Sequence, residues 1–125
     1  MIKFRALKNG VWYYFDFVNS QRWAKELLQK MAETDITFDF DTPFCQFTGL
    51  LDKQGKEIYE GDIVILTNVL TDNDKKICEA VMDGWQSIFE TVNDGFYCLM
   101  GNTAQAYREV IGNIYENPDL LKEVR

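Results

Sequence analysis

The residues with the clearest potential for chemistry are the aspartates of residues 34–44. Apolar and acidic side chains alternate there, as in a strand with one buried face, so that Asp35, Asp39 and Asp41 fall on one side. Residues two apart in a strand are about 7 Å apart. Such a row could gather Mg²⁺ or Ca²⁺, which take carboxylate oxygens, or could imitate a run of phosphates. The interpretation that we favour is a solvated strand face whose charge opposes edge-to-edge aggregation.

Carboxylates also define one enzymatic alternative, a divalent-metal phosphoesterase that would use this row or Asp72 and Asp74. A metal site needs ligands that converge in three dimensions, and a single strand does not establish that. Asp72 and Asp74 begin a segment similar to a calcium-binding loop, but Lys76 occupies the next ligand position, and neither the expected glycine nor the closing glutamate follows. We therefore expect no EF-hand, and we assign no metal site.

The chain contains no histidine. This excludes Ser-His-Asp and Cys-His nucleophilic catalysis, imidazole general bases and nearly all zinc and copper sites. Cys45, Cys78 and Cys98 are widely spaced and form no CxxC pair, so they are interpreted as reduced, mostly buried thiols of a cytosolic protein. We predict a protein that is not an enzyme, with no catalytic residues and no cofactor.

A second group of residues, at the start of the chain, combines basic and aromatic side chains: Lys3, Arg5, Tyr13 and Tyr14. Aromatic side chains stack bases in single-stranded nucleic-acid binders, which makes a nucleic-acid-binding small barrel a second alternative. Core packing of the aromatic residues is favoured, because the net charge is −7 and the pI is about 4.5. Nucleic-acid binders usually carry a basic face, so nucleic acid is an unlikely partner.

The best predicted helix covers about residues 20–32. Trp23, Leu27 and Met31 recur in it at a spacing of four and form one stripe. The stripe most simply packs on a sheet, but an amphipathic helix can also present such a stripe to a partner. Trp23 and Leu27 therefore join Asp35, Asp39 and Asp41 as the candidate interaction surface.

Most of the remaining chain shows the periodicity of strands. Alternating or β-branched apolar runs, bounded by glycine, asparagine and aspartate, predict strands connected by short turns. Asn9-Gly10 is expected to join the first two strands as a hairpin, and residues 67–76 are expected to form a polar loop. The predicted strands are residues 2–7, 11–17, 56–59, 63–66, 77–82, 85–92, 96–100 and 109–115.

The turns at the centre of the chain lie within residues 46–64. Asp52 starts a turn, and Asp62 is expected to accept a backbone N–H in the next one. Three glycines are expected to supply backbone geometries that residues with a Cβ reach only at a cost. They are Gly49, Gly55 and Gly61.

The end of the chain carries two further structural signals. Gly112, inside a predicted strand, indicates a bulge or a close approach of the backbone to another segment. Asn117 and Pro118 predict the start of a short C-terminal helix, with asparagine as the N-cap and proline at the first helical position.

Three of these segments together resemble the YopX family, small proteins encoded mainly by phages and prophages of Gram-positive bacteria. They are residues 2–6, 46–64 and 109–121, which cover the start, centre and end of the chain in the family's order. Leu7 stands where a tryptophan is common, Phe47 replaces a usual tyrosine, and Leu51 replaces a usual polar residue. The resemblance implies a mostly β fold with a small barrel-like core. It implies no activity, because the family's function is uncharacterised.

A chain of 125 residues and 14.6 kDa is expected to form a single YopX-like domain over residues 1–125. Its expected fold class is mostly β (α+β). The expected architecture is a small SH3-like or partly open β-barrel core with one amphipathic helix and a short C-terminal helix.

The expected location is the cytoplasm of a bacterial host cell. No stretch of the sequence is long and apolar enough to span a membrane, and the N-terminus lacks a continuous apolar signal region. We interpret the chain as a phage or prophage accessory protein, most simply a non-catalytic, protein-binding module. Its partner would be a host or phage protein, and self-association is left open because sheets have edges.

Overall fold

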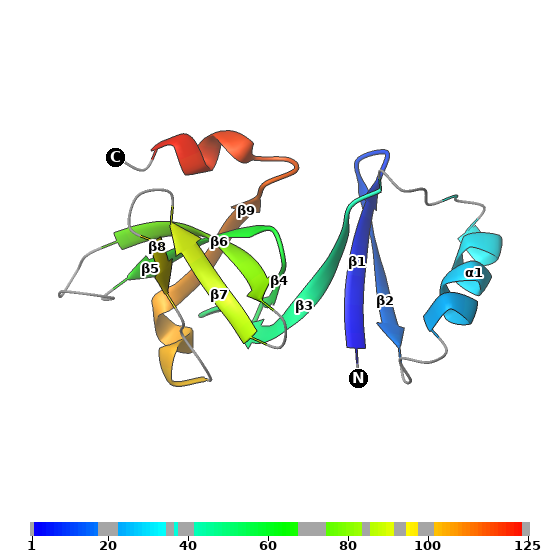
Figure 1. Cartoon of the computed structure of the whole chain (residues 1–125), viewed down its shortest axis with the longest axis horizontal. Coiled ribbons are helices and arrows are strands. Elements are labelled where there is room, and N and C mark those ends of the chain that lie inside the picture. The colour runs from blue at the N-terminus through cyan, green and yellow to red at the C-terminus, as the bar shows by residue number, and fades with distance from the viewer. Residues whose placement is uncertain are drawn as a thin grey trace. The chain divides into compact units, whose positions relative to one another are not determined.

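The computed structural model describes residues 2–17, 23–34, 37, 42–67, 75–83, 86–91, 95–97 and 102–123. These residues form strands, one α-helix and two short 3-10 helices, and the fold is mostly β with little helix, which confirms the predicted fold class (Figure 1). The elements are β1 (Ile2–Lys8), β2 (Val11–Phe17), α1 (Trp23–Thr34), β3 (Phe44–Leu51), β4 (Glu57–Tyr59), β5 (Asp62–Thr67), β6 (Lys75–Asp83), β7 (Gln86–Thr91), β8 (Gly95–Tyr97), η2 (Asn102–Tyr107), β9 (Arg108–Asn113) and η3 (Pro118–Glu123).

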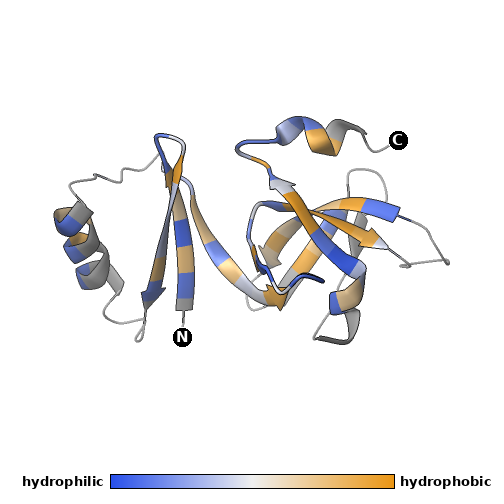
Figure 2. Cartoon of the chain, turned by 180° about the vertical axis from the view of Figure 1, so that it is seen from behind, coloured by the Kyte–Doolittle hydropathy of each residue, from blue (hydrophilic) through white to orange (hydrophobic). Residues whose placement is uncertain are grey.

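The first sheet has the strand order β2-β1-β3-β4. β1 and β2 pair antiparallel, and Asn9 and Gly10 connect them with φ angles of 54° and 78°. Two consecutive residues with positive φ are what the type I′ turn of an Asn-Gly hairpin requires, so the predicted hairpin is confirmed. Hydrophilic and hydrophobic residues alternate along β1, as expected of a strand with two different faces (Figure 2).

One face of this sheet carries a small hydrophobic cluster. Ala6 and Phe15 are buried in it, and Phe4 and Tyr13 pack against them. The helix α1 contacts β2, the strand that precedes it in the chain. The helix predicted for about residues 20–32 is therefore present, between Trp23 and Thr34.

The strand predicted for residues 34–44 is wrong at four of the five residues that the structure describes in this range, namely Thr34, Thr37, Thr42 and Pro43. Thr34 is the last residue of α1, Thr37 lies in no strand, and Phe44 is the first residue of β3. The last turn of α1 gains from Gln29, whose Nε2 donates a hydrogen bond of 3.2 Å to Glu33 four residues on, and this contact supports the continuation of the helix to Thr34, the first residue of the predicted strand. Residues 35, 36 and 38–41 lie outside the described residues.

The second sheet has the order β8-β7-β6-β5-β9, and each pair of neighbours is antiparallel. It curls into a half-barrel. In β5 Ile63, Val64 and Leu66 are fully buried, so this predicted strand is buried on both faces. The register between β5 and β9 shifts between Ile63 and Val64, so β9 has a bulge that leaves Ile111 without a partner in the register, next to Gly112, where a bulge or a close approach was predicted.

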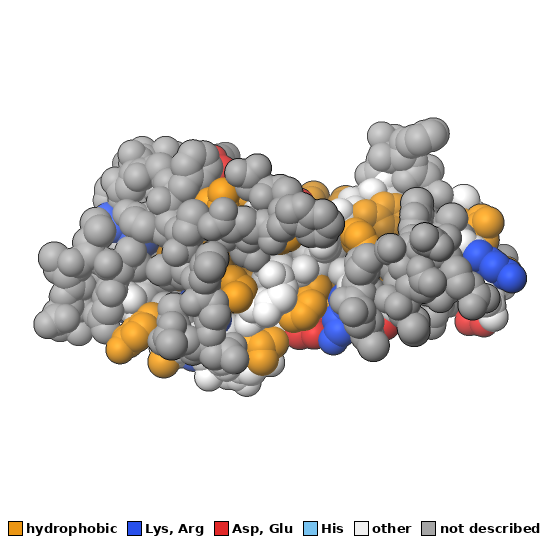
Figure 3. All heavy atoms as spheres, turned by 60° about the horizontal axis from the view of Figure 1, so that its bottom comes forward, with side chains coloured by type: hydrophobic (Ala, Val, Ile, Leu, Met, Phe, Trp, Pro, Cys, Tyr) orange, Lys and Arg blue, Asp and Glu red, His pale blue; other side chains and the backbone are white. Residues whose placement is uncertain are grey.

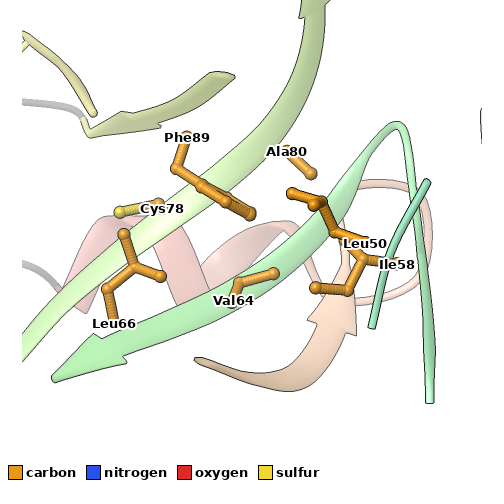
Figure 4. Packing of buried hydrophobic residues seen from close by; sticks show 7 residues of the cluster. All are labelled: Leu50, Ile58, Val64, Leu66, Cys78, Ala80 and Phe89. Atoms are coloured by element: carbon orange, nitrogen blue, oxygen red, sulfur yellow. The ribbon is translucent and has the colours of Figure 1, made fainter. Parts of the chain in front are cut away.

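The core of this sheet is a single apolar cluster. Strand β5 contributes Val64 and Leu66, and their neighbours come from β3, β4, β6 and β7 (Figure 4). Val110 of β9 packs against the cluster. The remaining members are Leu50, Ile58, Cys78, Ala80 and Phe89.

Several predicted boundaries differ from the observed ones. Lys75 and Lys76 begin β6 instead of ending a loop, because they pair with Thr67 and Leu66 across the sheet. β9 ends at Asn113, two residues before the predicted end, since residues 114–116 form a turn. The rest of the predicted loop, residues 68–74, lies outside the described residues.

The chain divides into two compact units, Met1–Phe47 and Thr48–Arg125, which we call the N-terminal and the C-terminal unit. Each holds one of the two hydrophobic clusters described above. The expectation of a single domain over residues 1–125 stays a prediction.

Candidate functional site

Most of the predicted interaction surface lies where the structure gives no side chains. Asp35, Asp39 and Asp41 are outside the described residues, and so are Asp72 and Asp74. Trp23 and Leu27 belong to α1, but only their backbone is described. In the described part of the chain, no group of three or more cysteine, aspartate or glutamate side chains could hold a metal ion.

The basic and aromatic residues of the first hairpin do not form one patch. Arg5 pairs with Tyr14 across the hairpin, so these two side chains share a face of the sheet, while Tyr13 lies on the other face in the hydrophobic cluster. Arg5 is only 4% exposed, and its guanidinium lies 4.1 Å from the centre of the Trp12 ring. Lys3 lies 5.4 Å from the centre of the Phe47 ring. Both distances are those of cation–π contacts, and the burial of Arg5 withdraws it from any phosphate.

Large apolar side chains are exposed mainly in the N-terminal unit. Within the described residues, four of the six exposed large hydrophobic side chains belong to it, and the other two are tyrosines of the C-terminal unit. Figure 3 shows hydrophobic side chains reaching the surface of the molecule on the face in view. The exposed fractions are Val11 50%, Tyr14 56%, Leu28 63% and Phe44 38%, against Tyr107 46% and Tyr115 41%.

Asp52 occupies the turn between β3 and β4 and is almost completely buried. Its Oδ1 accepts hydrogen bonds from the backbone N–H groups of Gln54 and Lys56, both at 2.9 Å. Its Oδ2 accepts a third, at 3.1 Å, from Val110 of β9. One carboxylate thus closes its own turn and joins that turn to a strand 58 residues further along the chain.

Arg108, the first residue of β9, has no exposed surface. Its Nε and Nη2 donate to the carbonyl oxygen of Leu51, at 3.1 and 2.8 Å. Burial lowers the pKa of the Arg108 guanidinium, and the negative charge of Asp52 acts in the opposite sense. Sequence reasoning missed this residue, because its partners lie more than 50 residues away and no local pattern identifies them.

The other residues singled out in segment 46–64 have the backbone geometry or the hydrogen bond that was expected of them. Gly49, Gly55 and Gly61 have φ angles of 85°, 82° and 88°. The Oδ2 of Asp62 accepts a hydrogen bond of 2.8 Å from the N–H of Tyr59, and both residues are buried. This is the turn chemistry that we predicted for Asp62, and it leaves that carboxylate away from solvent.

A compact corner follows β9. Asn113 and Asn117 bond each other: the Asn117 N–H donates to the Asn113 carbonyl at 2.8 Å, and the Asn113 N–H donates to Oδ1 of Asn117 at 3.2 Å. Pro118 begins η3 as predicted, but the Asn117 side chain turns back to β9 and does not cap the N–H groups of η3, so its predicted N-cap contact is wrong. A Cβ on Gly112 would lie 2.6 Å from Oδ1 of Asn117 and 2.9 Å from Cδ1 of Leu120, which confirms the close approach.

Three glutamates lie together on the C-terminal unit. The register places Glu79 of β6 opposite Glu90 of β7 on one side and Ile63 of β5 on the other. Burial, followed by the charges of Glu90 and Glu60, raises the pKa of the Glu79 carboxyl. Like charges that face each other across a sheet destabilise it, so repulsion among these glutamates lowers the stability of the folded unit.

These observations define a small, mostly β protein in which the buried charged side chains described above contact backbone groups and aromatic rings of the same chain. The chain matches the family model described as "YopX protein" over residues 3–122, and it belongs to the YopX family. No curated protein matches it. Within the described residues, no helix has the length and apolar character needed to cross a membrane.

Two solved structures show the same fold. The chain is similar to the crystal structure of the YopX protein from Bacillus subtilis, with 19% identity, a TM-score of 0.59, and 98% of each chain covered. It is also similar to the crystal structure of protein EF1440 from Enterococcus faecalis, with 20% identity, a TM-score of 0.55, and 97% and 98% of the two chains covered.

Proposed function

We propose that the protein is a non-catalytic, protein-binding module, and that its N-terminal unit contacts the partner. The observation that carries this proposal is the exposure of large apolar side chains in that unit, above all Tyr14 and Leu28. Exposed apolar residues are normal when they are scattered singly. Here four of the six exposed large hydrophobic side chains described belong to the N-terminal unit, which contains fewer than half of the residues of the chain.

The distribution of charge supports the same assignment. The N-terminal unit has six basic and six acidic residues, whereas the C-terminal unit has seven basic and fourteen acidic residues. The whole net charge of −7 therefore belongs to the C-terminal unit. A unit without net charge repels neither acidic nor basic partners, and its exposed aromatic residues match the enrichment of tyrosine and phenylalanine in protein interfaces.

The partner and the biological setting are proposed from the family resemblance and the sequence. We infer a phage or prophage accessory protein that acts in the cytoplasm of a bacterial host and binds a host or phage protein. Asp35, Asp39, Asp41, Trp23 and Leu27 stay candidates for the contact surface. No specific observation favours the metal-dependent phosphoesterase, and the burial of Arg5 disfavours nucleic-acid binding.

The test is capture of the tagged protein's partner from nuclease-treated host lysate, followed by affinity measurement with the purified partner. Tyr14→Ser or Leu28→Ser should weaken binding by about 30-fold if the residue is a hot spot worth roughly 2 kcal/mol. Tyr107→Ser is the matched control, since it truncates a tyrosine of similar exposure in the C-terminal unit.

Two outcomes would contradict the proposal. A lysate that yields no stoichiometric partner would remove the protein-binding assignment. A partner that is lost with Tyr107→Ser and retained with both N-terminal variants would place the contact on the C-terminal unit.

A further inference from the structure

The turn between β1 and β2 contains the only Asn-Gly pair of the chain. Asn9 and Gly10 are both exposed. A Cβ placed on Gly10 would meet no atom within 4 Å, so the surroundings of this backbone nitrogen are open. Asparagine is among the chemically labile residues of proteins, and its lability depends on how freely the next backbone nitrogen can approach its side chain.

We propose that Asn9 is a site of spontaneous deamidation. The Gly10 nitrogen, after losing its proton to solvent base, bonds to the side-chain carbonyl carbon of Asn9. The bond from that carbon to the amide nitrogen breaks, and ammonia leaves. Water then opens the five-membered imide at either carbonyl, which produces aspartate or isoaspartate at position 9. Water is the only co-reactant, and no oxidant or reductant is needed.

The folded turn opposes this reaction only weakly. A type I′ turn holds Asn9 at a positive φ, and the turn must open before the nitrogen can reach the side-chain carbonyl. Opening separates the Lys8–Val11 pair that closes the hairpin. Val11 is half exposed, so little buried apolar surface is lost when this end of the hairpin opens.

Other asparagines of the structure provide internal controls. The side chain of Asn113 takes part in three hydrogen bonds: it donates to Glu116 and accepts from the N–H groups of Tyr115 and Glu116. Asn117 precedes Pro118, whose nitrogen carries no hydrogen and cannot attack in the same way. Asn9 has no comparable restraint among the hydrogen bonds described for the hairpin turn.

The two products have different effects on the hairpin. Aspartate at position 9 keeps the turn, because Asp-Gly also favours type I′ geometry, and adds one negative charge. In isoaspartate the main chain passes through the Cβ and Cγ atoms of the former side chain, so the turn becomes one atom longer. The pairing of Lys8 with Val11 then no longer fits, so the hairpin end that carries the exposed Val11 is reshaped.

The experiment is incubation of the full-length folded protein at mildly alkaline pH, with site-resolved peptide mass spectrometry over time. The amide of Asn9 should be lost on the order of 100-fold faster than that of Asn113, whose side-chain hydrogen bonds must break first. Both aspartate and isoaspartate should form, at a rate that rises with pH. Asn9→Gly should keep the hairpin, since Gly-Gly suits the same turn, and should form no such product.

Loss of the Asn9 amide no faster than that of Asn113 would overturn the proposal. So would a product that contains aspartate alone, because that product indicates direct hydrolysis without the imide.

Discussion

The two units of the chain each bury an arginine, and they do so by different means. In the C-terminal unit Arg108 lies beside the Asp52 carboxylate and donates twice to the Leu51 carbonyl. In the N-terminal unit Arg5 lies over the ring of Trp12. A buried charge requires compensation, and the ring of Trp12 supplies part of it for Arg5.

The contacts described thus differ between the two units, with directed hydrogen bonds around Arg108 and an aromatic ring over Arg5. Asp52 and Arg108 connect the β3–β4 turn to β9 through hydrogen bonds of defined direction. The contacts described in the N-terminal unit include an apolar cluster and two rings over cations, which are less directional, and aromatic surface is left outside. We therefore expect the C-terminal unit to be the more sensitive to single polar substitutions.

The largest effect is expected from Asp52→Asn. The variant keeps the shape of the side chain but removes the charge beside Arg108, and an amide nitrogen cannot accept the N–H of Val110. A buried N–H group that loses its charged acceptor costs about 1.5–3 kcal/mol. Urea denaturation measures the loss, with the exposed Asp16→Asn as control. Equal free energies of unfolding for the two variants would show that the buried hydrogen bonds of Asp52 do not organise the C-terminal unit.

Gly112→Ala should have the next largest effect. Its Cβ would press on Asn117 and Leu120, whose positions are set by the corner after β9. Overpacking of this kind costs about 1–3 kcal/mol. Gly55→Ala separates sterics from backbone strain, because it has positive φ but open space, and it should cost about 1 kcal/mol. Thermal unfolding of the two variants ranks them, and a larger loss for Gly55→Ala would refute the close-approach argument.

Trp12→Leu tests how much the ring of Trp12 stabilises the buried Arg5 of the N-terminal unit. The variant keeps an apolar side chain but removes the ring over Arg5, and we expect a loss of about 1–2 kcal/mol. Phe47→Leu is the companion variant, because it removes the ring over the more exposed Lys3 and should cost only about 0.5–1 kcal/mol. Denaturant titration compares the two. Similar losses for both would mean that burial of the cation does not strengthen the contact.

The smallest effect is expected from Glu79→Gln. The folded protein raises the pKa of Glu79 above its ordinary value of 4.5, so the folded state binds this proton more tightly than the unfolded state does. The free energy of unfolding therefore falls as pH rises through the folded-state pKa. Glutamine avoids this loss, and the variant should be more stable at neutral pH by less than about 1 kcal/mol, because the group is partly solvated.

Thermal unfolding of wild type and Glu79→Gln, followed from neutral to acidic pH, measures this difference. It should disappear below pH 4.5, where Glu79 is protonated in both states. A difference that is independent of pH would mean that its cause is packing and not charge.

Local turn chemistry was the part of the fold that the sequence predicted best. Asn9-Gly10, Gly61 and Gly112 occupy the positions expected of them, because their residue types restrict backbone geometry within a few residues. The strand expected at residues 34–44 is wrong at Thr34 for the complementary reason. Period-two alternation in a short window does not register a helix that reaches its first residue from the N-terminal side.

The hydrogen bonds that connect Asp52 with Val110 and Arg108 with Leu51 could not be predicted, because these residues are distant in sequence. Asp52 was identified as a turn residue from its neighbours, but the bond to Val110 depends on how β9 pairs in the sheet. Arg5 was expected on the first strand as part of a group of basic and aromatic residues, and its burial arises from the side chains around it. Alternation predicts which face a residue occupies, but it does not predict what covers that face.

The long reach of Asp52 also constrains the order of folding. The N–H groups of Gln54 and Lys56 are available as soon as the turn forms, whereas that of Val110 requires closure of a loop of 58 residues. Contacts of such high sequence separation slow folding, because the chain loses loop entropy before the contact forms. The third bond of Asp52 should therefore form late, and the amide of Val110 should exchange its hydrogen only when the C-terminal unit opens as a whole.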